Sequence, residues 1–292
     1  MDTQTDSFAD NWGRWGPNDE LGTLNFVTEA VRQRAAQAAR SGRSVSLAIP
    51  QHPAPMAGPM PFLPGTSPGA TQQLMLFTGS PPAALADVLF VNTHHVGLTH
   101  IDSLGHIPLD GKVYPGIPLA EVMGGAGLRH GSTAAFAGGI ITRGVLLDLA
   151  FAERLPESHP VTASDLDAAE KRGGTSIESG DAVLIRGGWA VRNAEAELLP
   201  WISRDAVEWL ALREVSILAS DIGDKPPRTP GAEMNLHQLA LARLGMPLID
   251  GADLEELAKV VQEESRTCFL LVVAPIPIHG ATGSPVNPIA IF

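Results

Sequence analysis

The stretch Thr93–His106, which reads THHVGLTHIDSLGH, holds the residues best suited to chemistry. Four of the nine histidines lie there, with the carboxylate of Asp102 among them. Imidazole nitrogens and carboxylate oxygens at this density are typical ligands of a divalent cation such as Zn²⁺ or Mn²⁺. His100 and Asp102 are two residues apart, so an extended segment places both side chains on one face. His106 follows four residues later, within reach of the same cavity without having to be a ligand.

A complete tetrahedral or octahedral site needs further ligands, and two later residues are candidates. His237 lies near the start of the segment NLHQLALARLG, whose leucines form an apolar helix face. Asp250 follows in GMPLIDGADLEEL, where its carboxylate can face the first cluster. An alternative stays open for both halves, because lone histidines near helix starts are often capping or surface residues and histidine clusters also occur in exposed loops.

The elements that must position these residues are predicted from apolar runs, turns and helix caps. Asp87–Val91 (DVLFV) predicts a buried strand that runs into the loop carrying the first cluster. Other strands are predicted at Ser44–Ile49, Gly144–Leu149, Ala182–Arg186, Val215–Ala219 and Phe269–Ala274. Helices are predicted at Thr28–Arg40, Thr162–Arg172, Ser203–Glu214, Asn235–Leu244 and Asp253–Glu263. Strands and helices interleave without strict βαβ alternation, so we predict an α/β fold with a mixed sheet and packed helices.

The composition is that of a globular protein with an acidic surface. Of the 292 residues, 44% are hydrophobic and 18% charged, and the net charge is −12. An acidic surface repels phosphate backbones, so nucleic acid is not an expected partner. The single cysteine excludes an internal disulfide and a cysteine-based zinc site. The first residues do not form a signal peptide, and the longest apolar run, Phe269–Ile278, is too short to span a bilayer. We therefore expect a cytoplasmic protein without a membrane partner.

The segment Gln51–Gly69 is rich in proline with interleaved apolar residues, which predicts an ordered loop near the site. It contains a G-x-S-x-G pattern centred on Ser67. This pattern is a poor match to a serine nucleophile elbow, because no strand precedes it. The next residue, Pro68, also has no N–H to offer an oxyanion hole.

Taken together, the motifs resemble those of the cyclase-like metal-dependent hydrolases, which include bacterial kynurenine formamidase, isatin hydrolase and a trans-dienelactone hydrolase. The matching segments include NWGRWGPNDELGTLNFVT, THIDSLGHIPLDGKVYPG, SGDAVLIRGGWA and GATGSPVNPIAIF, in the family's order. The resemblance implies one domain over residues 1–292 with a swivelling β/β/α arrangement. Residues 1–27 would form an N-terminal arm, in which Trp12, Trp15 and Phe26 either pack on the body or wall a substrate pocket. Relatives form dimers or higher oligomers, so a homodimer or homotetramer is expected.

The family's metal motif is His-x-Gly-x-His-x-Asp-x-x-x-His, and the resemblance assigns roles through it. His100 and Asp102 would be metal ligands, and His106 would be the catalytic acid/base. His237 resembles the ligand histidine of the second half, and Asp250 falls where the family usually has a glutamate ligand.

The first histidine of the motif falls at Val96, whose side chain cannot bind a metal. His95, one residue earlier, replaces it if the strand carries a bulge. His94 is the weaker candidate for the same role.

These roles predict a metal-dependent hydrolase of a small-molecule substrate, with Mn²⁺ or Zn²⁺ as cofactor. The predicted reaction is cleavage of a carbon–nitrogen bond in an amide, N-formyl or cyclic amide group, as in an arylformamidase. Lactone or ester hydrolysis stays an alternative, because no residue separates a leaving nitrogen from a leaving oxygen. A binding protein on a decayed hydrolase scaffold is the third alternative, and Val96 motivates it.

Overall fold

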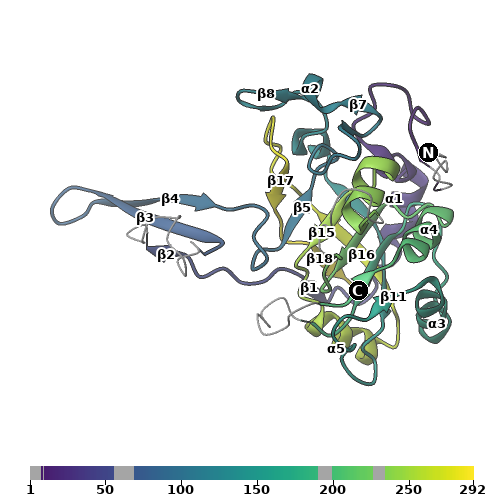
Figure 1. Cartoon of the computed structure of the whole chain (residues 1–292). Helices are drawn as coiled ribbons and strands as arrows, with labels where there is room; N and C mark the ends of the chain where they lie inside the picture. Colours follow the sequence, from purple (N-terminus) through teal and green to yellow (C-terminus); the bar gives the residue numbers. More distant parts are fainter. Residues whose placement is uncertain (1–7, 9, 56–68, 190–198, 226–233) are drawn as a thin grey trace.

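The computed structural model describes residues 8, 10–55, 69–189, 199–225 and 234–292. A nine-stranded mixed sheet forms the centre of the protein, in the order β1-β18-β16-β10-β12-β14-β15-β5-β17 (Figure 1). These strands are β1 (Ser44–Ser46), β5 (His100–Asp102), β10 (Ile140–Asp148), β12 (Ala182–Arg186), β14 (Ile217–Ser220), β15 (Leu248–Asp250), β16 (Cys268–Val273), β17 (Gly283–Pro285) and β18 (Ile289–Ile291).

The middle of this sheet is parallel and its two sides are antiparallel. Strands β10, β12, β14 and β15 run parallel to one another, whereas β16, β18 and β1 on one side and β5 and β17 on the other pair antiparallel. β14 is buried along its whole length and β12 along all but its last residue, as their continuous apolar runs predict. The predicted α/β class with a mixed sheet is confirmed.

Helices pack around the sheet, and their caps explain where they begin and end. The helices are α1 (Glu29–Ala36), α2 (Leu119–Val122), α3 (Ala163–Gly173), α4 (Arg204–Leu212) and α5 (Glu255–Glu264), with the 3₁₀ turns η1 (Gly22–Phe26) and η2 (Thr133–Phe136) and the π-helix η3 (Gln238–Leu244). Thr162 and Asp165 form a capping box before α3, and Gly174 ends the helix in the left-handed region. α1, α3 and α5 contact β10, and α4 packs on α3 and η3.

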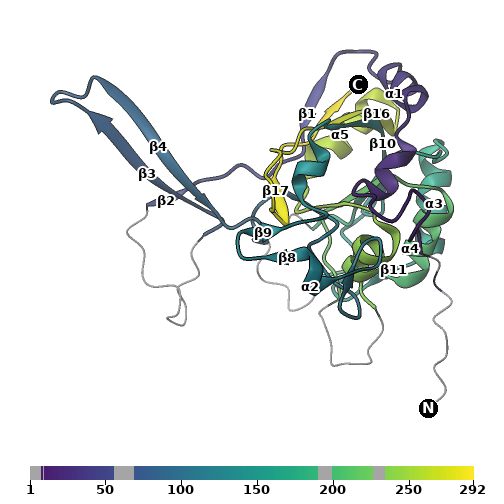
Figure 2. The ribbon, with the colours of Figure 1, turned by 90° about the horizontal axis from the view of Figure 1, so that it is seen from above.

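A long hairpin departs from this body. β2 (Ala54–Pro55), β3 (Thr71–Thr78) and β4 (Ala84–Val91) form a separate three-stranded sheet that projects away from the rest of the protein (Figures 1 and 2). The predicted strand at Asp87–Val91 exists, but the prediction that it is buried is wrong, since every residue of β4 is exposed. An apolar run usually signals burial, but no described part of the chain covers β4. Three short ribbons, β6–β7 (Lys112–Val113, Ile117–Pro118), β8–β9 (Met123–Gly124, Gly127–Leu128) and β11–β13 (Pro160–Val161, Trp201–Ile202), complete the strands.

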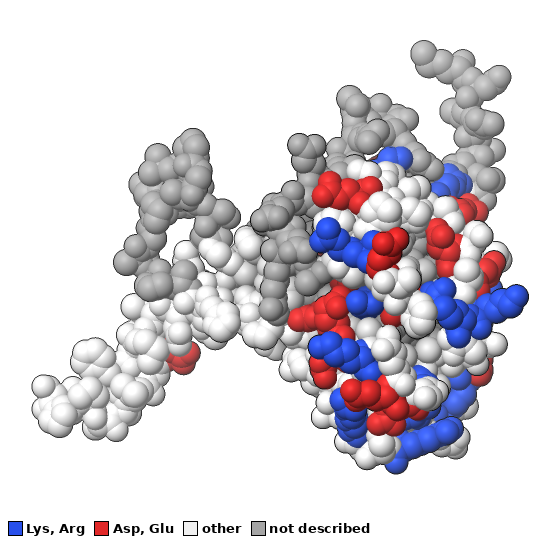
Figure 3. Space-filling model, turned by 90° about the horizontal axis from the view of Figure 1, so that it is seen from below, with Lys and Arg blue, Asp and Glu red and all other residues white. Residues whose placement is uncertain are grey.

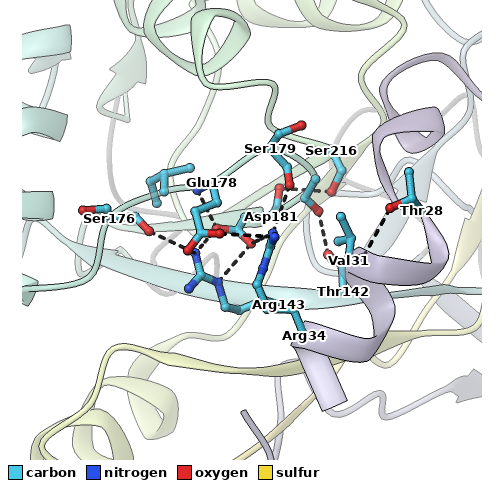
Figure 4. Close-up of polar contacts among 12 residues, drawn as sticks. Thr28, Val31, Arg34, Thr142, Arg143, Ser176, Glu178, Ser179, Asp181 and Ser216 are labelled. Atoms are coloured by element: carbon cyan, nitrogen blue, oxygen red, sulfur yellow. Dashed lines mark hydrogen bonds and ion pairs between the residues drawn. The ribbon is translucent and has the colours of Figure 1, made fainter. Parts of the chain in front are cut away.

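An ion network around the buried Asp181 ties α1 to β10 and to the segment just before β12 (Figure 4). The carboxylate of Asp181 is fully buried and accepts two hydrogen bonds from Arg143, at 3.0 and 2.5 Å. Arg34 of α1 lies 3.4 Å from the same carboxylate, and the backbone N–H of Glu178 donates to it at 2.8 Å. Because the planar guanidinium matches the carboxylate with two parallel bonds, the pair fixes orientation as well as proximity.

The described part of the N-terminal arm packs on its own body. The indole Nε1 of Trp12 donates to the carbonyl of Ala242 at 2.7 Å, and Trp15 lies edge-to-face on Phe26 at 5.1 Å. Both tryptophans are packed against the hydrophobic core. This contact favours the packing alternative for the arm over the pocket-wall alternative.

The proline-rich segment is described only at its ends. Residues 56–68, including Ser67 and its G-x-S-x-G pattern, lie outside the described residues, as do residues 1–7 and 9 of the arm. Among the described helices, none has the length and hydropathy needed to cross a membrane.

Candidate metal centre

The site is built on β5, a short strand held between two neighbours of the sheet. His100 and Asp102 are both buried on one face of β5, and Ile101 between them is buried on the other. β15 pairs antiparallel with β5 and places Asp250 directly opposite His100. Directly opposed residues share a face of the sheet, so the register brings three of the predicted ligands together.

Asp102 is the centre of the cluster. Its carboxylate Oδ1 lies 3.0 Å from Nδ1 of His94 and 3.5 Å from Nε2 of His100. Its Oδ2 lies 3.4 Å from Nε2 of His237 and 3.9 Å from Nε2 of His106. Asp102 is fully buried, and neither oxygen accepts a well-directed hydrogen bond. A carboxylate buried in this way is costly unless a cation or proton shared with the imidazoles compensates it.

His94 reaches the cluster from the loop that follows β4. Its Nε2 lies 2.9 Å from the hydroxyl of Thr282. Its ring stacks on that of His106 with parallel planes and a centroid distance of 3.7 Å, and meets the ring of His100 edge-on at 5.2 Å. The stacking fixes the plane of the His106 imidazole beside Asp102.

His95 does not join the cluster. Its Nδ1 accepts a hydrogen bond from the backbone N–H of Gly97 at 3.0 Å, and the residue is not among those that line the cavity. Val96 lies at the cavity with its side chain 73% exposed. The structure thus brings His94, the weaker candidate in sequence, to the place where a ligand was expected from His95.

His237 joins from the second half of the chain, immediately before η3. Its Nε2 lies 3.0 Å from Asp250, and its Nδ1 lies 2.7 Å from Asp224. Asp224 also accepts the backbone N–H groups of Leu236, at 3.0 Å, and of His237, at 3.2 Å. A carboxylate on the outer nitrogen fixes the tautomer of a metal-binding histidine and turns its other nitrogen towards the ion. Sequence reasoning missed Asp224, although its place soon after the apolar strand β14 was a usable signal.

The electrostatics of the cluster favour a positive charge at its centre. Burial works against ionisation of Asp102, yet the close imidazoles of His237 and His94, with His106 and His100 nearby, hold its pKa well below the usual value. Burial lowers the pKa of His106 to about 4, although Asp102 opposes the shift. Burial also disfavours the charged form of His237, but Asp250, Asp102 and Asp224 raise its pKa well above the usual value. The carboxylates of Asp250, Asp102 and Asp224 therefore favour a proton on His237 when no other cation is bound there.

The donor set fits a divalent metal ion. The ligand atoms of His94, Asp102 and His106 lie within 4.8 Å of one another, as do those of His100, Asp102 and Asp250. Two ligands of one ion at about 2.1 Å lie roughly 3.0–3.4 Å apart, so most of the measured separations suit a shared ion. Imidazole nitrogens mixed with carboxylate oxygens suit Zn²⁺ and Mn²⁺, so this fit leaves the choice between them open.

The cluster lies at a cavity of about 190 Å³. Apolar and glycine residues form the remaining wall, among them Leu199, Ile222 and Gly223. A larger hollow of about 470 Å³ lies between η1 and the start of β10. We place the site in the smaller cavity, because Arg32 is the one ionisable side chain in the described lining of the larger hollow.

Comparison with known proteins agrees with this fold. Residues 43–224, more than half of the chain, match the family model described as putative cyclase. A crystal structure of a novel cyclase is 28% identical with a TM-score of 0.83, covering 97% of this chain and 98% of that one. The isatin hydrolase A of Labrenzia aggregata, bound to benzyl benzoate, is 20% identical with a TM-score of 0.61, covering 90% and 98%. That of Ralstonia solanacearum is 23% identical with a TM-score of 0.61, covering 90% and 97%. No curated protein matches in sequence. The chain belongs to the putative cyclase family.

Proposed function

We propose that this protein is a metal-dependent hydrolase that cleaves a carbon–nitrogen bond of an amide, N-formyl or cyclic amide group. The observation that carries the proposal is the convergence of histidine and carboxylate donors on the buried Asp102, beside a further histidine, at the floor of a cavity. His94, His100, Asp102, His237 and Asp250 would hold the ion. A bound divalent ion supplies a coordinated water of lowered pKa and polarises the substrate carbonyl.

His106 would move the proton. Its Nε2 lies 3.9 Å from Asp102 and its ring is held flat against His94, so the nitrogen stays at the edge of the cluster. As the water oxygen bonds to the carbonyl carbon, the imidazole takes the proton that the water loses. As the carbon–nitrogen bond breaks, the imidazole returns a proton to the leaving nitrogen. The products are a carboxylate and an amine.

The cavity limits the substrate. About 190 Å³ is smaller than the pockets of roughly 300–1,000 Å³ that hold drug-sized ligands, which favours a small substrate. The apolar side chains of Leu199 and Ile222 would contact its apolar part and keep bulk water from the reacting carbonyl. Isatin, which the structurally similar isatin hydrolases are named for, is a small cyclic amide and therefore the first substrate to test.

The decayed-scaffold alternative loses its motivation, because His94 supplies a nitrogen where Val96 cannot. We therefore prefer a catalytic site to a binding protein with an incomplete one.

The experiment compares two adjacent histidines. His94→Ala should lose metal, measured by plasma mass spectrometry after reconstitution with Mn²⁺ or Zn²⁺, together with turnover of isatin and an N-formylated aromatic amine. His95→Ala is the matched control and should keep both. The proposal fails if the reconstituted wild-type chain binds no metal, or if it hydrolyses only a lactone.

His106 is tested separately. His106→Ala should keep full metal content and lose turnover. Loss of metal would instead make His106 a ligand, and full turnover with metal retained would remove it from the mechanism.

A further inference from the structure

The N-terminal arm holds the last turn of η3. The indole Nε1 of Trp12 donates to the carbonyl of Ala242 at 2.7 Å. Asn11 meets the next two carbonyls, because its backbone N–H donates to Arg243 at 3.0 Å and its side-chain Nδ2 donates to Leu244 at 2.9 Å. The arm thus satisfies three consecutive carbonyls at the end of a helix, where partners within the helix run out.

The contact continues just past the end of η3. Gly245 leaves the helix with φ 64°, in the left-handed region, and its carbonyl accepts the backbone N–H of Thr23 at 2.8 Å. Gly22 lies so close that a Cβ there would come within 1.9 Å of the same carbonyl oxygen. Ala242, Leu244 and Gly245 are all buried, so bulk water is a poor substitute for the donors of the arm.

These hydrogen bonds specify the rotation of η3, which its apolar residues leave open. Five of its seven residues are buried: Leu239, Ala240, Leu241, Ala242 and Leu244. A helix that is apolar all round has no amphipathic stripe that selects the face towards the core. A shift of one residue in register turns a helix face by about 100°. Directed hydrogen bonds at the end of η3 select one register, here the rare π form.

His237 lies at the other end of the same element. It immediately precedes Gln238, the first residue of η3, and its backbone N–H is held by Asp224 at 3.2 Å. Its Nε2 lies 3.0 Å from Asp250 and 3.4 Å from Asp102. Because a rotation of η3 would carry the imidazole with it, the arm at the last turn and Asp224 at the first turn together determine where this nitrogen points.

Charge contributes little to the hold of the arm on the body. Figure 3 shows side chains of both signs scattered over the body. The arm adds two ion pairs to them, Asp10 with Arg243 at 3.5 Å and Arg14 with Glu214 at 2.6 Å, and the four side chains are between 19% and 44% exposed. Ion pairs with this exposure are weak. The uncharged donors of the arm therefore supply the orientation of η3.

We propose that the N-terminal arm is a positioning element of the metal site. Trp12 and Asn11 hold the register of η3 and thereby keep His237 aimed at the cluster. The inference rests on the proposed function, in which His237 is a metal ligand. Neither arm residue lines the metal cavity, so both act through His237 and not on the substrate.

The test is Trp12→Phe, alone and combined with Asn11→Ala, measured by competition for Zn²⁺ or Mn²⁺ against a chromophoric chelator. Metal affinity should fall about 10-fold in the double variant, the lower end for loss of an outer partner, and by less in the single variant. Trp209→Phe is the matched control, because it removes a similar indole hydrogen bond, at 2.6 Å to Asp167 of α3, that involves neither the arm nor η3. The control should keep its metal affinity. Unchanged affinity in the double variant, or an equal loss in the control, would overturn the proposal.

Amide hydrogen exchange of the metal-free chain separates positioning from local capping. In the double variant the amides of η3 and the backbone N–H of His237 should exchange about 10-fold faster, because release of the last turn reaches the first. Faster exchange confined to residues 242–245 would make the arm a local cap and overturn the inference. If the double variant fails to fold, Trp12→Phe alone decides, with the same direction expected. A wild type that binds no metal would refute the proposed function, and exchange at His237 would still decide the role of the arm.

Discussion

Replacing Asp224 by asparagine tests how the second half of the site is oriented. The two carboxylate oxygens serve three donors: the N–H groups of Leu236 and His237 and the Nδ1 of His237. In Asp224→Asn one oxygen becomes an amide NH₂. If the NH₂ faces Leu236, it meets the backbone N–H of Leu236, so two hydrogen-bond donors oppose each other. If the NH₂ faces His237, it opposes the backbone N–H of that residue, and Nδ1 becomes an acceptor. The proton then moves to Nε2, which points at Asp250 and Asp102 and cannot bind a metal.

The size of the effect follows from the position of Asp224 behind His237, which we propose as a metal ligand. Removing the outer partner of a metal-binding histidine weakens metal affinity by about 10- to 100-fold, roughly 1.4–2.7 kcal/mol. The side chain of Asp224 is 13% exposed, so bulk water replaces the lost contact poorly. We therefore expect a loss of metal affinity near the upper end, about 100-fold.

The assay is competition for Zn²⁺ or Mn²⁺ against a chromophoric chelator. Asp165→Asn is the matched control, because the carboxylate of Asp165 also accepts a backbone N–H, that of Thr162 at 2.8 Å, but lies at α3 away from the cluster. It should reduce stability without changing metal affinity. Unchanged metal affinity in Asp224→Asn, or an equal loss in both variants, would refute the reasoning.

Two further predictions concern the scaffold and are read by urea denaturation. Arg143→Met leaves the carboxylate of Asp181 buried and short of its main partner, so the free energy of unfolding should fall by about 3–5 kcal/mol, and less in Arg143→Lys; a loss below about 1 kcal/mol would show that the pair contributes no more than a surface salt bridge. Gly144→Ala places a Cβ 2.3 Å from the buried ring of Phe269 and should cost about 1–3 kcal/mol, whereas Gly138→Ala meets nothing within 4 Å and should be near neutral; equal effects of the two substitutions would contradict the packing argument.

Local signals predicted the body of the fold well. β12 spans Ala182–Arg186, the predicted bounds, and the Thr162 cap with the glycines after Arg172 predicted α3 to within a residue. Strand runs and helix caps depend on residues that are close in sequence, so the sequence alone predicts them. The burial of Asp87–Val91 was predicted wrongly, because burial depends on which distant segments pack on a strand and an apolar run does not specify them.

In the site, too, features set by local sequence were predicted and features set by tertiary contacts were not. The one-face placement of His100 and Asp102 depends on strand alternation alone, and the structure has it. The choice between His94 and His95 depends on the path of a loop, which has no periodicity to predict it. The contact between Asp224 and His237 joins two segments across the fold, and only tertiary structure brings them together.

The pairing of β5 with β15 makes the strand register a part of the metal site in its own right. His100 and Asp250 meet because the two strands are in a particular frame, and a slip of one residue would put Ile249 or Gly251 opposite His100 instead. The pairing of His100 with Asp250 therefore depends on the frame of these two strands and not on the length of the chain between them. A single insertion within β15 would move Asp250 out of register with His100, although both residues would still be present. When relatives of this chain are aligned, the spacing inside these two strands is as diagnostic of a working site as the ligands themselves.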